Sequence, residues 1–500
     1  LKKYKNTTLI IKKEETVNIK KRSDKKVFKA LLISLFALLV FFEMGFKTFN
    51  DKPIDTFHEG ETLGAAVDYE NGKIPYKDTV FIHGIFQDPL RSIISFELWG
   101  RSVNSQRLMA SILEICVLII FLATIFSLFE FKIVYGVFAG ILALFFIDIS
   151  YVIPFRDITT YLFVITTALF YNKFILKIKF DDNDFVPKKY FLFYFLPLSS
   201  SFLGTISFIN SIDRGFYTFA SSSVSIFLTS FLLYKNKKIL LYFVLSSMLG
   251  FFLGTALLYI ALRGALIDFF KFVFTEIPSF KELLDGFVYD FGTRDLIPVI
   301  LISFILFYFV ERFSFYIFNI KNEKNLLNKI KDFVFDYYLE IFLFSISFFF
   351  YRSALGRCDF GHIMYVSGPL FLTLIYISVK RIFGLRKENN TNFLALAFIV
   401  LLFFSLTSAY KLDLPKYEKW WRFQKNFPDD QIIPENHINT VNFLKNNLKK
   451  DESFFTLTSE GTWYYFVNKP SPIKFPILIV ATPDFYQKEV VEQLRKNKKI

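Results

Sequence analysis

The sequence predicts a polytopic α-helical membrane protein with about eleven transmembrane helices and a small C-terminal α/β domain outside the membrane. Three observations support this fold class. Hydrophobic residues make up 53% of the 500 residues and 70 residues are Phe, whereas apolar residues make up roughly 45–50% of a soluble chain. Apolar runs long enough to cross ~30 Å of hydrocarbon recur along the chain. Basic residues gather at alternate ends of these runs, as the positive-inside rule predicts.

The first span is expected at residues 30–49, directly after a Lys-rich segment at residues 1–27. It lacks the short apolar core and small-residue cleavage site of a signal peptide. We therefore expect an uncleaved signal anchor with a cytoplasmic basic N-terminus. The remaining spans are expected at 106–129, 131–150, 158–176, 190–210, 216–234, 239–262, 296–318, 338–351, 363–379 and 392–410.

The distribution of lysine sets the expected orientation. With the N-terminus inside, the inward loops are rich in Lys and the short outward loops are nearly free of it. An odd number of spans then places residues 411–500 outside. In that region we expect a helix at 438–448, a strand at 453–458 and a helix at 486–497. The basic run after the last helix is compatible with a truncated domain.

The net charge of +14 does not indicate a nucleic-acid partner. The basic residues lie at the ends of apolar spans, where they signal topology, so no nucleic acid is expected. The two cysteines, Cys116 and Cys358, have no metal-ligand spacing and imply no disulfide framework.

The densest polar segment is the first outer loop, residues 50–105, which begins with Asp55, Glu59 and Glu61. On a helix, Asp55 and Glu59 share a face. Carboxylates shielded from bulk water at a membrane surface can have raised pKa values and act as general bases. The alternative is that they are ordinary acids at a helix N-terminus, favoured by the macrodipole. The density of charge in this loop favours the functional interpretation, with these three as catalytic candidates.

Two histidines and a further acid in the same loop are candidate substrate-binding residues. His58 and His83 can hydrogen-bond a phosphate, join carboxylates around a divalent metal, or be structural, and no metal-binding motif such as HExxH decides between these roles. Asp88 precedes Pro89, so we expect it to cap a helix, with substrate contact as a secondary role.

The other outward loops pair Arg with Asp, at 153–157, 211–215, 292–295 and 352–362. Arg offers a planar fork suited to phosphate or carboxylate. Each loop alone is best explained as a self-neutralising pair, but four on one face favour a shared anionic ligand. The candidate anion-binding residues are Arg156, Asp157, Arg214, Arg352, Arg357, Asp359 and His362.

The early acids Asp55, Glu59 and Glu61, the later Gly72-Lys-Ile-Pro-Tyr-Lys-Asp78 and the outer Arg156-Asp157 resemble the GT-C superfamily of membrane glycosyltransferases. That superfamily includes protein O-mannosyltransferases and the aminoarabinose transferases of lipid A. The resemblance covers residues 1–160 by motif and the rest by architecture. The frequent Asp-Glu pair of the family appears here as His58-Glu59. The tryptophan-rich acceptor signature of oligosaccharyltransferases is not found around Trp463.

The resemblance implies a GT-C-like domain at 28–410 in a bacterial cytoplasmic membrane, with the site on the outer face. It implies a polyprenyl-phosphate sugar as donor, a lipid, glycan or protein as acceptor, and an inverting displacement. A carboxylate, Glu59 or Asp55, would be the base, and Arg156, Arg357 and Arg214 would bind the phosphate. No cofactor is required, since a nucleotide-binding fold is not needed for such a donor, and a divalent metal stays open.

Two other functions remain possible from the sequence. A lipid-linked glycan flippase or transporter would need a polar path, and the charges within spans, Glu43, Glu114, Asp148 and Glu311, are too few to form one. An O-antigen-type polymerase or ligase would also act on the outer face, but would use a lipid diphosphate donor.

Overall fold

The computed structural model describes residues 30–40, 54–146, 152–180, 191–280, 296–319, 325–354, 360–383 and 433–497. These residues form helices and no strand; the one extended pairing among them is an isolated bridge between Pro75 and Thr79. The predicted basic N-terminus and the predicted span at 392–410 lie outside the described residues.

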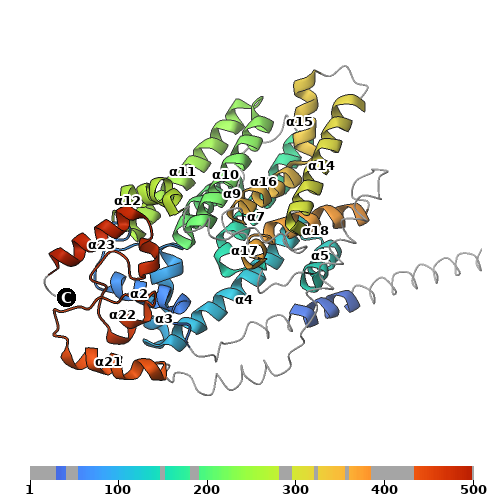
Figure 1. Ribbon diagram of the computed structural model, residues 1–500. Helices are drawn as coiled ribbons and strands as arrows, with labels where there is room; N and C mark the ends of the chain where they lie inside the picture. The colour runs from blue at the N-terminus through green and yellow to red at the C-terminus, as the bar shows by residue number, and fades with distance from the viewer. Residues whose placement is uncertain are drawn as a thin grey trace, which may run out of the picture.

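A bundle of long apolar helices forms the larger part of the molecule (Figure 1). Five of them are long and apolar enough to cross a membrane: Val103–Leu128, Phe155–Ile178, Phe191–Asn210, Ile212–Leu233 and Lys237–Ala261. They correspond to α4 (Val103–Leu128), η2 to α8 (Phe155–Asp157 to Leu176–Phe180), α9 (Phe191–Asn210), α10 (Ile212–Leu233) and α11 (Lys237–Ala261). The chain is thus an α-helical protein with the helices of a membrane protein.

Further helices fall at other predicted spans. Helix α15 (Leu326–Asp336) and α16 (Tyr338–Ala354) meet at a 76° bend and count as a sixth span if taken together. Helix α5 (Ile133–Phe146) and the helix Ala30–Val40 are shorter. Helices α14 (Leu296–Asn319), α17 (Phe360–Tyr365) and α18 (Gly368–Ile382) also fall in or beside predicted spans. Five to six spans are therefore evident in the described residues, not the eleven that the sequence predicts.

The bundle is held together by close helix contacts at small residues. A methyl group at Gly250 on α11 would lie 2.1 Å from the carbonyl oxygen of Leu198 on α9. A methyl group at Gly254, one turn later, would lie 2.7 Å from Cβ of Thr205 on the same neighbour. Small residues let helix backbones approach in this way where lipid gives no hydrophobic driving force.

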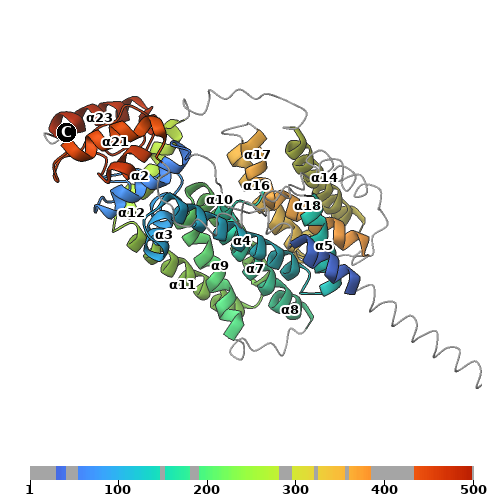
Figure 2. The same ribbon diagram turned by 90° about the horizontal axis from the view of Figure 1, so that it is seen from below.

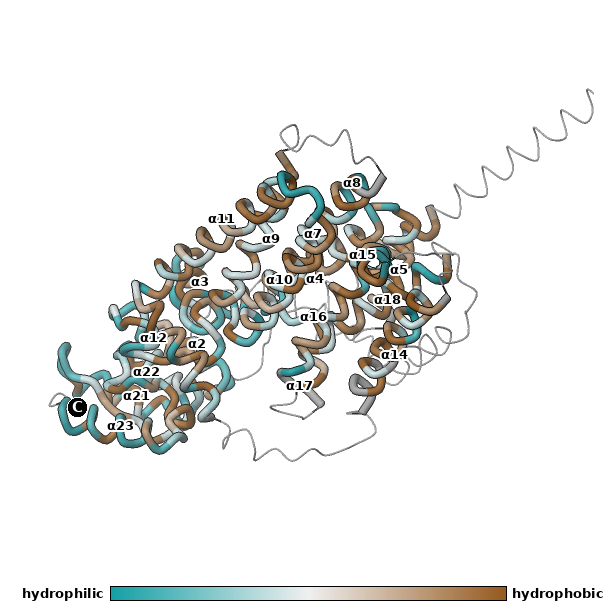
Figure 3. Tube along the Cα trace, turned by 90° about the horizontal axis from the view of Figure 1, so that it is seen from above, coloured by the Kyte–Doolittle hydropathy of each residue, from teal (hydrophilic) through white to brown (hydrophobic). Residues whose placement is uncertain are grey.

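A polar cap covers one end of the bundle. It contains α2 (His58–Glu70), η1 (Phe86–Leu90), α3 (Arg91–Trp99), α12 (Leu266–Lys271) and η5 (Phe272–Glu276) from the first part of the chain. The C-terminal helices α21 (Glu435–Asn447), α22 (Thr462–Val467) and α23 (Asp484–Lys496) pack beside them (Figures 1 and 2). Figure 3 shows hydrophilic residues over this cap and hydrophobic residues along the bundle.

Two hydrogen bonds fix which helix ends meet the cap. The amide of Ile212 donates to the carbonyl of His83, which places the junction of α9 and α10 there. The hydroxyl of Tyr69 donates to the carbonyl of Ala261, which places the end of α11 there. The helix ends predicted to face outward at these positions therefore lie together at the capped end of the bundle.

The C-terminal region is attached to α2 by direct backbone contact. Methyl groups at Gly60 and Gly64, on one face of α2, would lie 2.8 Å from the Thr462 nitrogen and 2.7 Å from the Gly461 oxygen. Buried Asp68 adds polar links: it accepts hydrogen bonds from Lys73, from Thr79 and from the amide of Ser471. The first outer loop and the C-terminal region thus form one packed unit.

The predicted strand at 453–458 is wrong. The segment is extended but has no strand hydrogen bonding, and the described C-terminal residues contain helices and irregular chain only. Its alternating pattern instead places Phe454 against the ring of Tyr464, while the Ser453 hydroxyl donates to the carbonyl of Pro470. A β-propensity pattern yields a strand only where a partner strand is available. The α/β character predicted for the domain is therefore not found in the described residues.

Candidate active site

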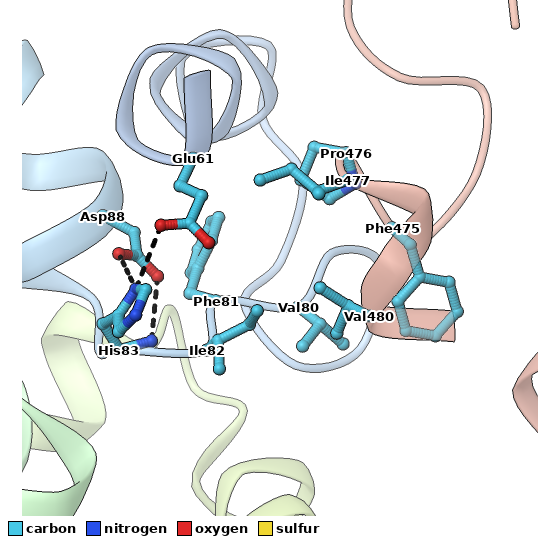
Figure 4. A pocket seen from close by; sticks show the side chains of 10 residues that line it. All are labelled: Glu61, Val80, Phe81, Ile82, His83, Asp88, Phe475, Pro476, Ile477 and Val480. Atoms are coloured by element: carbon cyan, nitrogen blue, oxygen red, sulfur yellow. Dashed lines mark hydrogen bonds and ion pairs between the residues drawn. The ribbon is translucent and has the colours of Figure 1, made fainter. Parts of the chain in front are cut away.

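A pocket lies between the first outer loop and the C-terminal region (Figure 4). One wall carries Glu61, His83 and Asp88, and the other consists of apolar residues 475–480. The space between the walls opens to solvent, and its enclosed part is about 10 Å³, room for about one water molecule. A backbone hydrogen bond from the Val80 amide to the Lys474 carbonyl holds the two walls together. A polar group facing an apolar wall at the capped end of the bundle makes this the candidate active site.

Glu61 points from α2 into this pocket (Figure 4). Its side chain is 13% exposed, and its Oε2 lies 3.9 Å from Nδ1 of His83. No hydrogen bond to its carboxylate is found in the described part of the chain. Burial and the neighbouring Asp88 raise the pKa of Glu61, although His83 and Arg156 act to lower it. A buried carboxylate with a raised pKa and free oxygens can accept a proton.

His83 and Asp88 form a fixed pair beside Glu61. The backbone amide of His83 donates to one Asp88 oxygen at 3.0 Å, and the His83 ring nitrogen Nδ1 lies 3.1 Å from the other. Burial acts to lower the pKa of His83, but Asp88 and Glu61 outweigh it, and the net shift is upward. The predicted helix cap at Asp88 is wrong, because its oxygens serve His83 and the residue lies inside η1.

Glu59 is engaged in a two-point salt bridge with Arg107. Arg107 donates from Nε to Oε1 at 2.6 Å and from Nη2 to Oε2 at 2.7 Å. The Asp55 amide donates to Oε2 as well. Sequence patterns do not select Arg107, because it begins a span and has no neighbouring Asp. The salt bridge gives Glu59 a structural role between α2 and α4.

Asp55 and His58 lie at the surface. One Asp55 oxygen accepts from the amides of Phe57 and His58, as an N-cap does, and the other lies 2.8 Å from His58 Nδ1. The side chains are 53% and 73% exposed. Burial acts to raise the pKa of Asp55, but the hydrogen bonds from His58 hold it below its usual value. Asp55 thus fits the helix-terminus alternative better than the catalytic one.

Two arginines of the Arg–Asp loops differ in their contacts: Arg214 is paired, and Arg156 is not paired with any described residue. Arg214 donates to buried Asp157 at 2.7 Å, to Asp213 at 2.9 Å and to the Tyr365 carbonyl at 2.8 Å. Its guanidinium is therefore committed to joining helices. Arg156, in contrast, makes no side-chain hydrogen bond or ion pair to any residue that the structure describes. It does not line the pocket, but its charge acts on both Glu61 and His83, which do.

The last Arg–Asp loop is only partly described. Arg352 is exposed in the last turn of α16, and His362 is half-buried in α17. Neither lines the pocket. Arg357 and Asp359 lie outside the described residues.

Metal-binding groups were sought over the same described ranges. No cluster of three or more His, Cys, Asp or Glu side chains that could hold a metal ion occurs there. Of the two candidate ligands, His58 is paired with Asp55, and His83 is paired with Asp88 and lies 3.9 Å from Glu61.

Comparison with known proteins adds no relative. No protein-family model matches the chain, and no curated protein matches it. The site's chemistry is therefore argued from its own residues.

Proposed function

We propose that this protein is a membrane glycosyltransferase that moves a sugar from a polyprenyl-phosphate donor to a lipid, glycan or protein acceptor. The observation that carries the proposal is the half-buried Glu61 carboxylate, which faces a pocket and has a raised pKa. The GT-C-like order of acids and arginines in the sequence supports the same reaction. The reaction takes place at the capped end of the bundle, which we propose is the outer face of a bacterial cytoplasmic membrane.

Glu61 is the proposed general base. Of the three acidic candidates, it is the one whose oxygens are directed at a pocket. The charge of Glu59 is neutralised by Arg107. Asp55 accepts a hydrogen bond from an amide at the start of α2. Glu61 takes the proton of the acceptor hydroxyl or amine as the nucleophile attacks the anomeric carbon. His83 acts to lower the pKa of Glu61 and so favours the ionised base, whereas Asp88 acts to raise it and holds His83 in place.

Arg156 is the proposed binding partner of the donor phosphate. Guanidinium groups stabilise negative charge on phosphate oxygens, and Arg156 is the cation close enough to influence Glu61 electrostatically. A base and an anion-binding group are the two elements that a single inverting displacement needs. The apolar wall at 475–480 would exclude water from the reacting carbon.

The test uses the purified full chain in lipid nanodiscs with a panel of polyprenyl-phosphate hexoses and pentoses. Cell-envelope extract supplies the acceptor, and released polyprenyl monophosphate is the readout. Glu61→Gln should lose at least about 100-fold in rate, whereas Asp55→Asn should keep most of it. Activity with diphosphate-linked sugars alone would favour a polymerase or ligase. Full activity of Glu61→Gln would remove the proposed base.

A further inference from the structure

Arg91, the first residue of α3, is a buried cation that forms no hydrogen bond or ion pair with any residue the structure describes. Its side chain is almost fully enclosed, with 6% of the residue exposed. The guanidinium carbon lies 4.9 Å from the centre of the Phe155 ring, and Nε has no hydrogen-bond partner. Within the described part of the chain, Arg91 forms no hydrogen bond and no ion pair. A buried charge in this state is unfavourable unless something else compensates it.

Three carboxylates, Asp88, Glu114 and Glu59, act on Arg91 electrostatically, and Asp88 and Glu59 are committed to other groups. Asp88, three residues earlier, accepts from the amide and ring of His83. Glu59 accepts from Arg107 and from the Asp55 amide. Both act on Arg91 at longer range without bonding to it. The fold therefore surrounds Arg91 with acids and gives it none of their hydrogen bonds.

A second unpaired arginine is close by. Arg156 follows Phe155, whose ring lies against Arg91, and its positive charge acts on Arg91 directly. Burial, together with Arg156, lowers the pKa of Arg91 to about 10, although Asp88 opposes the shift. Two neighbouring unpaired guanidinium groups repel each other, and an anion placed between them would relieve both.

We propose that Arg91 and Arg156 together bind the phosphate of the lipid donor, and that this pair prefers a phosphate with two negative charges to one with a single charge. The inference rests on the proposed function and extends it, because it names the charge state of the lipid phosphate that the site favours, which is that of the departing monoester. Neither paired arginine, Arg107 nor Arg214, has the donors free to do this.

A preference for the doubly charged phosphate would favour the proposed reaction, because the phosphate gains negative charge during it. A polyprenyl-phosphate sugar is a phosphodiester with one negative charge. When the acceptor oxygen or nitrogen attacks the anomeric carbon, the bond between that carbon and the phosphate oxygen breaks. Its electron pair stays on the phosphate, and the acceptor proton passes to Glu61. The product is a phosphate monoester, which gains a second negative charge above its pKa of about 6. Interactions that strengthen as this charge develops raise kcat.

Binding is measured with three short probes on the purified full chain. Farnesyl phosphate carries two negative charges at pH 8, farnesyl methyl phosphate carries one, and farnesol carries none. We expect wild-type protein to bind the monoester at least about tenfold more tightly than the diester, and to bind farnesol weakest. This preference should vanish at pH 5, where the monoester holds a single charge.

The variants compared are Arg91→Met and a matched control, Arg101→Met, which removes an arginine paired with Glu70 near the end of the same helix. Arg91→Met should lose the monoester preference, and Arg101→Met should keep it. In a transfer assay, Arg91→Met should lower kcat more than it raises KM. An unchanged monoester preference in Arg91→Met would overturn the inference.

Thermal unfolding without ligand gives a second, independent readout. Replacing an unpaired buried charge by an apolar side chain should leave the melting temperature unchanged or raise it. Arg214→Met, which breaks a paired buried arginine, should lower it. If Arg91→Met melts as far below wild type as Arg214→Met, then Arg91 is structural and the inference fails.

Failure of the inference can be told apart from failure of the proposed function. Sugar transfer with unchanged kcat in Arg91→Met would reject the role of Arg91 and leave the transferase intact. Monoester preference that depends on Arg91, combined with no transfer from any donor, would leave the anion site and reject the transferase.

Discussion

Glu59 and Arg107 are joined at two points, with Nε to Oε1 at 2.6 Å and Nη2 to Oε2 at 2.7 Å. The pair connects the first turn of α2 to the first turn of α4, so it sets the direction in which α2 leaves the bundle. Glu61 lies two residues further along α2, on a different face, and its approach to the pocket depends on this setting. Of two neighbouring acids, one is thus held by structure and the other is available for chemistry.

Breaking this salt bridge should destabilise the protein without removing the proposed base. Glu59→Gln leaves a buried Arg107 without its counter-charge, which costs on the order of 3 kcal/mol. A double replacement of Glu59 and Arg107 by Met should recover part of that loss. Thermal unfolding of the full chain in detergent measures both. Equal stability of Glu59→Gln and wild type would show that the pair contributes little.

The pH dependence of transfer should report on Glu61. The base must be ionised, and its pKa is raised above the ordinary value of 4.5, so the rate should fall as the pH drops through the raised value. Arg156 lowers the pKa of Glu61. Arg156→Gln should therefore move the acid limb of the pH–rate profile to higher pH, apart from any loss of rate. An acid limb that stays in place, as expected for Arg101→Gln, would separate Arg156 from Glu61.

The His83–Asp88 pair should stabilise the fold in a defined pH range. The folded pKa of His83 is raised above 6.5, so its stabilising contribution is fully present below 6.5 and is lost as pH rises through the folded value. Asp88→Asn removes the main group that raises this pKa. We expect Asp88→Asn to lower the melting temperature more at pH 6 than at pH 9. An equal loss at both values would mean that His83 is neutral in the folded protein.

Helix α2 should not tolerate added volume at its contact with the C-terminal region. A methyl group at Gly64 would lie 2.7 Å from the Gly461 carbonyl oxygen, and such overpacking costs about 1–3 kcal/mol. Gly64→Ala should lower the melting temperature and expose residues 433–497 to protease. The matched control is Gly72→Ala, where an added methyl meets nothing within 4 Å and the φ of +86° alone is strained. It should leave protease resistance of the C-terminal region unchanged.

The sequence predicted the helices well where composition alone decides them. The expected span at 106–129 is α4, Val103–Leu128, and the expected span at 239–262 is α11, Lys237–Ala261. An apolar run of membrane length has few alternatives to a helix, because its backbone must satisfy its own hydrogen bonds. The strand at 453–458 failed since its outcome depends on a partner elsewhere in the chain.

The sequence predicted the acidic loop, but it favoured different candidate bases from those that the structure favours. Glu59 and Asp55 stood first because they match the family's pattern, and Glu61 stood third. Burial decides between them, and burial of Glu61 depends on the apolar wall at 475–480, far away in the chain. Arg91 belongs to the same polar loop, but that it bonds to no carboxylate among the described residues follows from what Asp88 and Glu59 bind, which no local pattern records.

The direct contact of Gly60 and Gly64 with Gly461 has a consequence for how the protein is made. The two walls of the pocket are far apart in synthesis, with 403 positions between Asp68 and the amide of Ser471 that it binds. The wall that carries Glu61 reaches its final environment only after nearly the whole bundle has been threaded into the membrane. Until then its glycine face has nothing to pack against, and Glu61, the proposed base, lacks the burial that raises its pKa. Under the proposed function, the site would therefore be completed late in biogenesis, when the C-terminal region docks.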